Sequence, residues 1–235
     1  MRALWVALAM ILGACSNSAE VRYKVTVEVD DNGTHRAGSS VMRFALSKPT
    51  VALVSPYNAE FAGEAVAVDL GNGRILYALL KDEEGDGAAI QMLPERLFKD
   101  LSSGTERVRN IKDIASNEGL VRDVPRFWPA ISDSREPMVQ YPLLVRFRSP
   151  DQPESIEAVA PDALDRAFGP GVRLKRITAE ITDAPVTDGI ERRLPWLAEV
   201  GRVRGTIIPN PPRFLKDSTP IQRISPSDFT TELYK

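Results

Sequence analysis

The feature that most constrains the fold is a strict alternation of apolar and polar residues over residues 22–30. Tyr23, Val25, Val27 and Val29 would share one face of an extended chain, and the side chains between them are charged or carry a hydroxyl. A period of two with β-branched residues is typical of a strand that buries one face. The Asp-Asp-Asn-Gly sequence that ends this run tolerates the positive φ angles of a tight turn. The pattern therefore predicts the first arm of an antiparallel hairpin.

The same reasoning predicts strands along most of the chain. Residues 39–47 form the second arm of the hairpin, with Gly38 as a bulge or a bend. Residues 172–182 are the longest strand expected, and a shift of the apolar phase between Leu174 and Ile177 indicates a bulge there. Shorter strands are expected at residues 51–53, 64–70, 74–80, 88–93, 143–147 and 155–159.

Helices are expected to be few and short, because 18 prolines punctuate the chain. Residues 94–101 and 161–168 each place apolar side chains at helical spacing after a proline. Residues 189–194 predict a last helical turn that Asp188 is placed to cap. Residues 106–115 form either another short helix or a loop.

Together these elements predict an α+β, β-rich fold, built on antiparallel hairpins with a few short helices. We expect one domain over residues 22–208, and the weakest point for a division lies near residues 125–140. Residues 209–235 begin with three prolines in four positions and predict a proline-rich extended C-terminal tail.

The first fifteen residues predict an export signal. Arg2 precedes an uncharged, apolar run over residues 3–12, which is too short to span a bilayer. The run ends in Leu12, Gly13, Ala14 and Cys15, which resemble the lipobox of bacterial lipoproteins. The resemblance implies a signal peptide over residues 1–14, acylation of Cys15, and a lipid-anchored tether over residues 15–21. The alternatives are an ordinary secretory signal with an incidental cysteine, or a short buried helix.

Acylation of Cys15 would decide both the location and the available chemistry. The protein would face the periplasm from a membrane, and Ser16 favours the outer membrane, because aspartate there retains enterobacterial lipoproteins at the inner one. Cys15 is the only cysteine, so disulfides, zinc thiolates and cysteine nucleophiles are then excluded. The net charge of −2 argues against nucleic acid as a partner. We expect no cofactor and no metal, and partners limited to membrane lipid and another envelope protein.

Two loops contain residue types that can do chemistry. His35 is the only histidine and lies near Ser39 and Ser40, but no G-x-S-x-G motif surrounds these serines, which favours a solvated turn histidine. Residues 82–87 place acids at alternate positions before a glycine, as a calcium loop begins, but position twelve is Leu93 instead of glutamate. A solvated hairpin turn is the better interpretation.

Three further sets of residues are weaker candidates. The glycines around Pro170 precede three basic residues and offer an anion site, although a helix stop followed by a charged strand face explains them equally. Carboxylates close in sequence form candidate acid–base pairs, and two tryptophans next to prolines are candidates for a groove or for core anchors. These residues are Gly169, Gly171, Arg173, Lys175 and Arg176; Glu180 with Asp183, and Asp162 with Asp165; and Trp128 and Trp196.

The body of the chain resembles a group of proteobacterial and prophage-associated lipoproteins without a known activity. The resemblance implies no catalytic residue. We therefore expect a non-enzymatic envelope lipoprotein that binds a partner or supports an assembly, and the alternative is a carboxylate-dependent hydrolase of cell-wall or glycan substrates. The segments that carry the resemblance are residues 23–29, 38–41, 168–178, 181–183 and 194–197.

Overall fold

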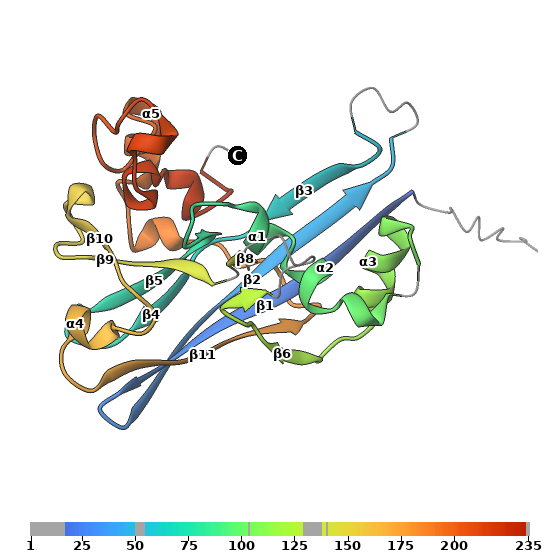
Figure 1. Ribbon diagram of the computed structural model, residues 1–235, viewed down its shortest axis with the longest axis horizontal. Coiled ribbons are helices and arrows are strands. Elements are labelled where there is room, and N and C mark those ends of the chain that lie inside the picture. The colour runs from blue at the N-terminus through green and yellow to red at the C-terminus, as the bar shows by residue number, and fades with distance from the viewer. Residues whose placement is uncertain (1–16, 50–54, 103, 129–137, 140, 234–235) are drawn as a thin grey trace, which may run out of the picture.

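The computed structural model describes residues 17–49, 55–102, 104–128, 138–139 and 141–233 (Figure 1). The signal peptide, Cys15 and the strand expected at residues 51–53 lie outside these residues. The strands are β1 (Ser18–Asp31), β2 (Thr34–Ser47), β3 (Asn58–Ala62), β4 (Val66–Asp69), β5 (Ile75–Asp82), β6 (Val121–Asp123), β7 (Phe127–Trp128), β8 (Met138–Val139), β9 (Pro142–Phe147), β10 (Ile156–Ala158) and β11 (Val172–Ile181).

The helices are all short. The α-helices are α1 (Ala88–Gln91), α2 (Leu93–Leu97), α3 (Arg107–Ala115), α4 (Leu164–Phe168) and α5 (Leu197–Val203). The 3-10 turns are η1 (Lys99–Leu101), η2 (Pro153–Ser155), η3 (Ile190–Arg192), η4 (Leu215–Asp217), η5 (Pro220–Arg223) and η6 (Pro226–Asp228). Within the described ranges, none of the helices has both the length and the apolar character needed to cross a membrane. The predicted β-rich, antiparallel α+β class is confirmed.

The hairpin of β1 and β2 is the longest element of the fold and runs diagonally across Figure 1. The two strands pair over all 14 residues of each, from Ser18 opposite Ser47 to Asp31 opposite Thr34. The two-residue turn has φ of 53° at Asn32 and 82° at Gly33, which only a type I′ turn requires at both positions. The predicted hairpin and its turn are confirmed.

The tether expected over residues 15–21 is wrong in its second half. β1 already begins at Ser18, and Val21 is only 1% exposed, because its side chain packs into the core. Val21 continues the apolar phase of Tyr23 by one more period of two. Only residues 16 and 17 therefore separate Cys15 from the first strand.

The large sheet has the strand order β3-β2-β1-β11-β6. Its inner face carries the predicted apolar residues of β1 and β2 and is covered by the small sheet and by α1, α2 and α3. The bulge expected in β11 is confirmed: Glu28 pairs with Arg176 and Val29 with Leu174, so Lys175 is the extra residue.

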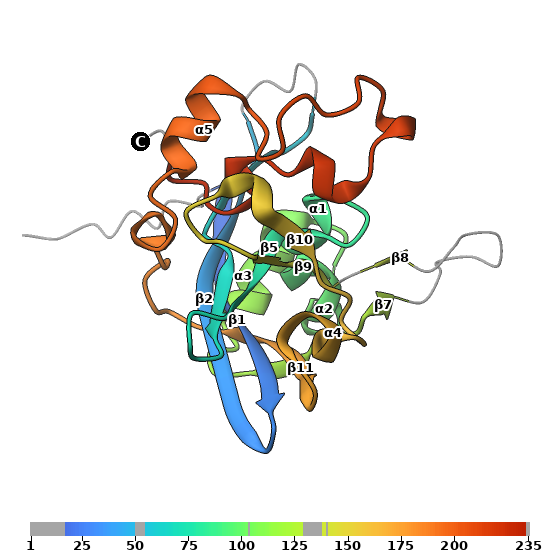
Figure 2. The same cartoon turned by 90° about the vertical axis from the view of Figure 1, so that its left-hand side faces the viewer.

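The small sheet, in the order β10-β9-β5-β4, is buried on both faces. Val66, Leu76 and Ala78 face the large sheet, whereas Tyr77 and Leu79 face the C-terminal segment. Figure 2 shows α5 and the C-terminal turns above β9 and β10, with the β1–β2 hairpin pointing the other way.

Gly38 is neither a bulge nor a bend. It pairs with Val27 in an unbroken register. A Cβ at this position would overlap the carbonyl oxygen of Ala67 in β4. The glycine is therefore needed because the backbone of β4 crosses directly beneath β2.

The strand expected at residues 88–93 is also wrong, because this segment forms α1 and leads into α2. The carboxylate of Asp86 accepts a hydrogen bond from the N–H of Ala88, and Ile90 and Leu93 then bury their side chains three positions apart. The helix expected at residues 94–101 is present as α2 and η1. At residues 106–115 the structure has a helix, α3, whose N-cap Glu106 accepts from the N–H of Arg109.

The expected extended tail over residues 209–235 is wrong, because this segment completes the second core. Ile224 and Phe229 are both 0% exposed and pack on the small sheet, together with Leu197 of α5, a helix that the sequence did not predict. Pro220 and Pro226 begin the turns η5 and η6, where a missing N–H costs nothing.

A buried ion pair fastens this segment to the small sheet. The Nζ of Lys81 lies 2.7 Å from Oδ2 of Asp228, and the two side chains are 6% and 18% exposed. Lys81 also donates to the carbonyl of Arg223 at 3.2 Å. Both strands of evidence place a charge that the fold can bury only as a pair.

We predict that Lys81→Met destabilises the protein by about 3 kcal/mol, because it leaves the Asp228 carboxylate buried without its cation. The measurement is the free energy of unfolding in urea. The control is Lys24→Met, which removes the more exposed pair of Lys24 with Glu180 and should cost at most about 1 kcal/mol. Equal losses in the two variants would contradict the proposed role of Lys81.

Candidate functional site

A polar cavity of about 420 Å³ opens where the two sheets meet beside the loop that follows β11. We call it the Glu64 cavity. β2 supplies one wall, the start of β4 supplies the floor, and the loop with η3 supplies the other wall. Its lining residues are Ser39, Glu64, Ala65, Ala67, Thr187, Asp188, Gly189, Ile190, Arg192 and Arg193.

Glu64 is the buried charge of this cavity. The residue is 8% exposed, and its Oε2 accepts a hydrogen bond from the N–H of Ile190 at 2.7 Å. Burial raises the pKa of the Glu64 carboxyl above its usual value, and the negative charges of Glu191 and Asp188 raise it further. The Ile190 N–H acts in the opposite direction. The site therefore contains a carboxyl group that holds its proton to higher pH than an exposed glutamate does.

The same contact corrects the expected cap of the last helical turn. Asp188 makes no side-chain capping bond to η3, and Gly189 takes the N-cap position with φ of 107°. Glu64 satisfies the N–H of Ile190 instead, from a strand 126 positions earlier. Tertiary contact has replaced the local cap.

Two cations and one further acid form the rim. Arg192 and Arg193 are exposed, and the guanidinium of Arg192 donates to the carbonyl of Asp188 at 3.4 Å. The rim thus offers positive charge to solvent, while the negative charge of Glu64 lies deeper and is hydrogen-bonded.

The loop is held to β2 by Thr187. Its N–H donates to the carbonyl of Val41 at 3.0 Å, and its Oγ1 accepts from the N–H of Val41 at 2.8 Å. This is the pairing that a neighbouring strand would make, but it covers one residue of β2. The loop therefore stops where a longer strand would continue.

Beyond Thr187 the edge of β2 is open. β3 pairs with β2 only over residues 43–47. Among the described residues, no strand pairs with His35–Ser39 on the side away from β1. We call this segment the open edge. His35, Ala37 and Ser39 are exposed along it, and Ser39 also lines the Glu64 cavity.

His35 and its serines do not form a catalytic set. His35 and Ser39 lie four residues apart on a regularly paired strand, which separates their Cα atoms by about 13 Å. Ser40 points to the inner face and is 1% exposed. The side chain of His35 is 57% exposed, and its Nδ1 lies 4.0 Å from Oε2 of Glu28.

The acids of residues 82–87 organise their own turn. Oδ1 of Asp82 accepts from the N–H groups of Glu84 and Asp86, at 3.0 and 2.7 Å. Burial raises the pKa of Asp82, which confirms that the carboxyl is enclosed by the turn. In the part of the chain that the structure describes, no three acidic, histidine or cysteine side chains gather where they could hold a metal ion.

The basic residues after Gly171 surround a carboxylate of the large sheet. Arg176 lies 2.7 Å from Oε1 of Glu28, and Lys175 lies 3.8 Å from Oε2. The hydrogen bond from Arg176 lowers the pKa of Glu28. Gly171 packs against the Asn32 side chain of the hairpin turn. These cations neutralise an internal acid, and the glycines serve the turn.

The other predicted acids are not brought together as pairs. Glu180 lies 2.6 Å from the Nζ of Lys24, and Asp162 lies 3.8 Å from Arg126. Asp183 accepts from Arg22 through its backbone carbonyl, and Asp165 accepts from the N–H of Arg166. Each of these groups has a local structural role.

Trp196 is a core anchor. Its ring packs edge-on against Phe147, with 5.3 Å between centroids, and its Nε1 donates to the carbonyl of Pro150 at 2.8 Å. The side chain of Trp128 lies outside the described residues.

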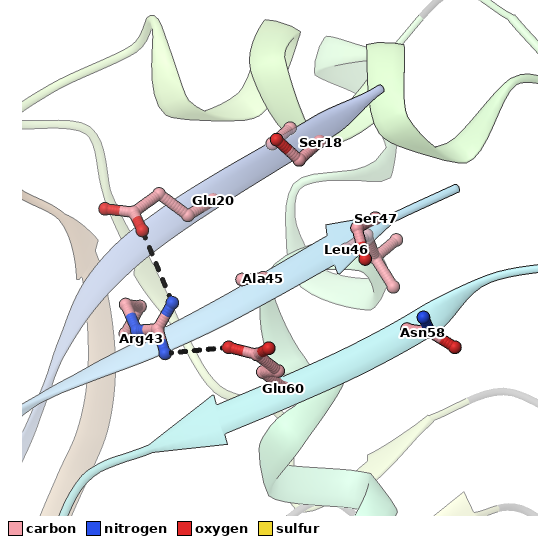
Figure 3. Close-up of a pocket in the computed structure, with 9 residues that line it drawn as sticks. Ser18, Glu20, Arg43, Ala45, Leu46, Ser47, Asn58 and Glu60 are labelled. Atoms are coloured by element: carbon pink, nitrogen blue, oxygen red, sulfur yellow. Dashed lines mark hydrogen bonds and ion pairs between the residues drawn. The ribbon is translucent and has the colours of Figure 1, made fainter. Parts of the chain in front are cut away.

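A second pocket of about 360 Å³ lies on the large sheet near the start of β1 (Figure 3). Figure 3 shows Arg43 between Glu20 and Glu60, to which it is joined at 3.4 and 3.3 Å. These ion pairs are exposed and contribute little to stability. No buried polar group enters this pocket, so it is a weaker site than the Glu64 cavity.

The sequence analysis missed Glu64 as a site residue. It placed residues 64–70 in a strand without singling out the acid. The available signal was a single carboxylate inside the apolar run Phe-Ala-Gly-Glu-Ala-Val-Ala-Val. The residues that complete the site, Thr187 to Arg193, are far away in the sequence and carry no motif.

Comparisons with known proteins assign nothing to this site. No protein-family model matches the sequence, and no curated protein or solved structure matches it. The argument for function therefore rests on the contacts and charges of the described residues.

We predict that Glu64→Gln stabilises the protein at neutral pH. The raised pKa means that ionising Glu64 costs more in the fold than in the unfolded chain, whose carboxyl titrates near 4.5. The wild type therefore loses stability as pH rises from about 4.5 through the folded pKa, and glutamine avoids this loss. The measurement is the difference in unfolding free energy between the two proteins from pH 4 to pH 8. A difference that stays constant over this range would contradict the prediction.

Proposed function

We propose that this chain is a lipid-anchored protein of the bacterial envelope, facing the periplasm, that holds a partner protein without catalysing a reaction. The observation that carries the binding role is the open edge of β2 beside the Glu64 cavity. A strand edge with free backbone groups, next to an exposed pair of arginines, is a surface that recognises another chain.

The anchor supports this role by fixing the distance to the membrane. Three Cα–Cα steps of 3.8 Å separate Cys15 from Ser18, so β1 begins within about 11 Å of the acylated residue. Several acyl chains give stable anchoring, because each buried CH₂ adds about 0.8 kcal/mol. The domain would be held close to the membrane surface, and Ser16 favours the outer membrane.

A second candidate function is a carboxylate-dependent hydrolase of cell-wall or glycan substrates. The observation in its favour is that Glu64 and Asp188 line the same cavity. Glu64, with its raised pKa, would be the general acid, and Asp188 would be the ionised carboxylate. The carboxylate pairs that the sequence offered for this chemistry are engaged elsewhere in the fold.

We predict that Cys15→Ala abolishes acylation and processing. Cells fed an alkynyl palmitate should label the wild-type protein, whereas the variant should stay unlabelled and keep residues 1–14. Ser16→Ala is the control, because it leaves the cysteine and the residues before it unchanged, and it should be labelled like the wild type. A Cys15→Ala protein that is processed and remains in the detergent phase would refute the anchor.

We predict that a photo-crosslinking residue at Ser39 or Arg193 forms a discrete adduct with one envelope protein in intact cells. The same residue at Arg109, which is exposed on α3, is the control and should not form that adduct. The binding role would be wrong if neither site gives an adduct. Release of cell-wall fragments by the purified wild type, lost in Glu64→Gln, would instead support the hydrolase.

A further inference from the structure

We propose that the open edge, His35–Ser39, binds an extended acidic peptide as an additional strand of the large sheet. This inference rests on the proposed binding function and names the chemistry of the partner. The juxtaposition that carries it is a regular strand edge, a cavity beneath it, and a rim of arginines.

The backbone geometry of the edge is complete. Val41 directs both its N–H and its carbonyl away from β1, to Thr187. Ser39, Ala37 and His35 follow in the same phase of the strand, so their N–H and carbonyl groups also point away from β1. An incoming strand would therefore continue, over three residues, the pairing that Thr187 begins.

The edge lacks the features that usually prevent such pairing. Strand edges are commonly blocked by proline, by a bulge, or by a covering segment. The open edge contains no proline, and its register with β1 is unbroken. Among the described residues no segment pairs with it, and three of its residues are exposed.

The cavity gives one face of the added strand a place to lie. Gly38 lets the backbone of β4 approach β2, so Ala67 lies beneath the edge. Ser39, Ala65 and Ala67 all line the Glu64 cavity. Alternate side chains of the added strand would point into this space, and the others would point to solvent.

The charge around the edge favours an acidic partner. Arg192 and Arg193 are exposed on the rim, and the buried Nε of Arg36 has no hydrogen-bond partner in the described part of the chain. The negative charge of Glu64 is already hydrogen-bonded to Ile190. A second copy of this chain would bring the same arginines to the edge, and like charges repel, so we commit to a peptide of opposite charge.

The test uses the full-length, acylated protein in detergent micelles and a phage library of random twelve-residue peptides. We expect the selected peptides to be rich in glutamate and aspartate. The most enriched peptide is then synthesised with a fluorescent label and with N-methyl groups at alternate residues, in one phase or in the other. Methylation in one phase should weaken binding at least tenfold and in the other phase less than twofold, because only alternate N–H groups face the edge.

Variants of the protein test the same contact from the other side. Ala37→Pro removes an N–H that points away from β1, which an edge strand tolerates, and should weaken binding at least tenfold. Ala37→Val is the matched control and should bind within twofold of the wild type. Arg192→Glu together with Arg193→Glu should lose the acidic peptide at least tenfold, and this arm stands if the proline variant does not fold.

Four results would overturn the inference. These are equal binding of the two N-methylated peptides, unchanged binding by a folded Ala37→Pro protein, selected peptides without an acidic bias, and a dimer of the wild type that Ala37→Pro disrupts. A crosslink from Ser39 in cells, together with any of these results, would leave the proposed function standing and reject only the acidic strand.

Discussion

The pairing of β1 along both of its edges is the interaction on which the rest of the structure depends. β2 runs along one edge for 14 residues and β11 along the other, so β1 is the central strand of the large sheet. Its apolar face, from Val21 to Val29, forms the wall against which the small sheet and α3 pack. A one-residue slip would turn this face to solvent, and the type I′ turn at Asn32 and Gly33 prevents it.

The small sheet turns this wall into two cores. It is buried against the large sheet on one side and against the C-terminal segment on the other. The segment that contains Ile224 and Phe229 is therefore part of the folding unit, although its prolines resemble those of a tail. Lys81 and Asp228 fix it in place, and a buried ion pair of this kind contributes geometry more reliably than it contributes stability.

The Glu64 cavity follows from how the two sheets meet. β4 can cross under β2 only at Gly38, and β3 pairs with β2 only beyond that crossing. This leaves a strand edge without a partner and a carboxylate enclosed beside it. Burying Glu64 costs stability, as its raised pKa indicates, and the fold retains this cost at the one corner where an edge, a cavity and exposed arginines coincide.

The sequence by itself determined the local structure: the hairpin, its turn, the bulge in β11 and the β-rich class all follow from periodicity and turn chemistry, which act over a few residues. Tertiary structure decided what periodicity cannot encode. Residues 88–93 became helical, and the proline-rich end folded into a core, because burial against distant strands outweighed local preference. Glu64, Thr187 and Arg192 carry no motif and meet only after the sheets have packed, since a site assembled from long-range contacts leaves no signal in sequence spacing.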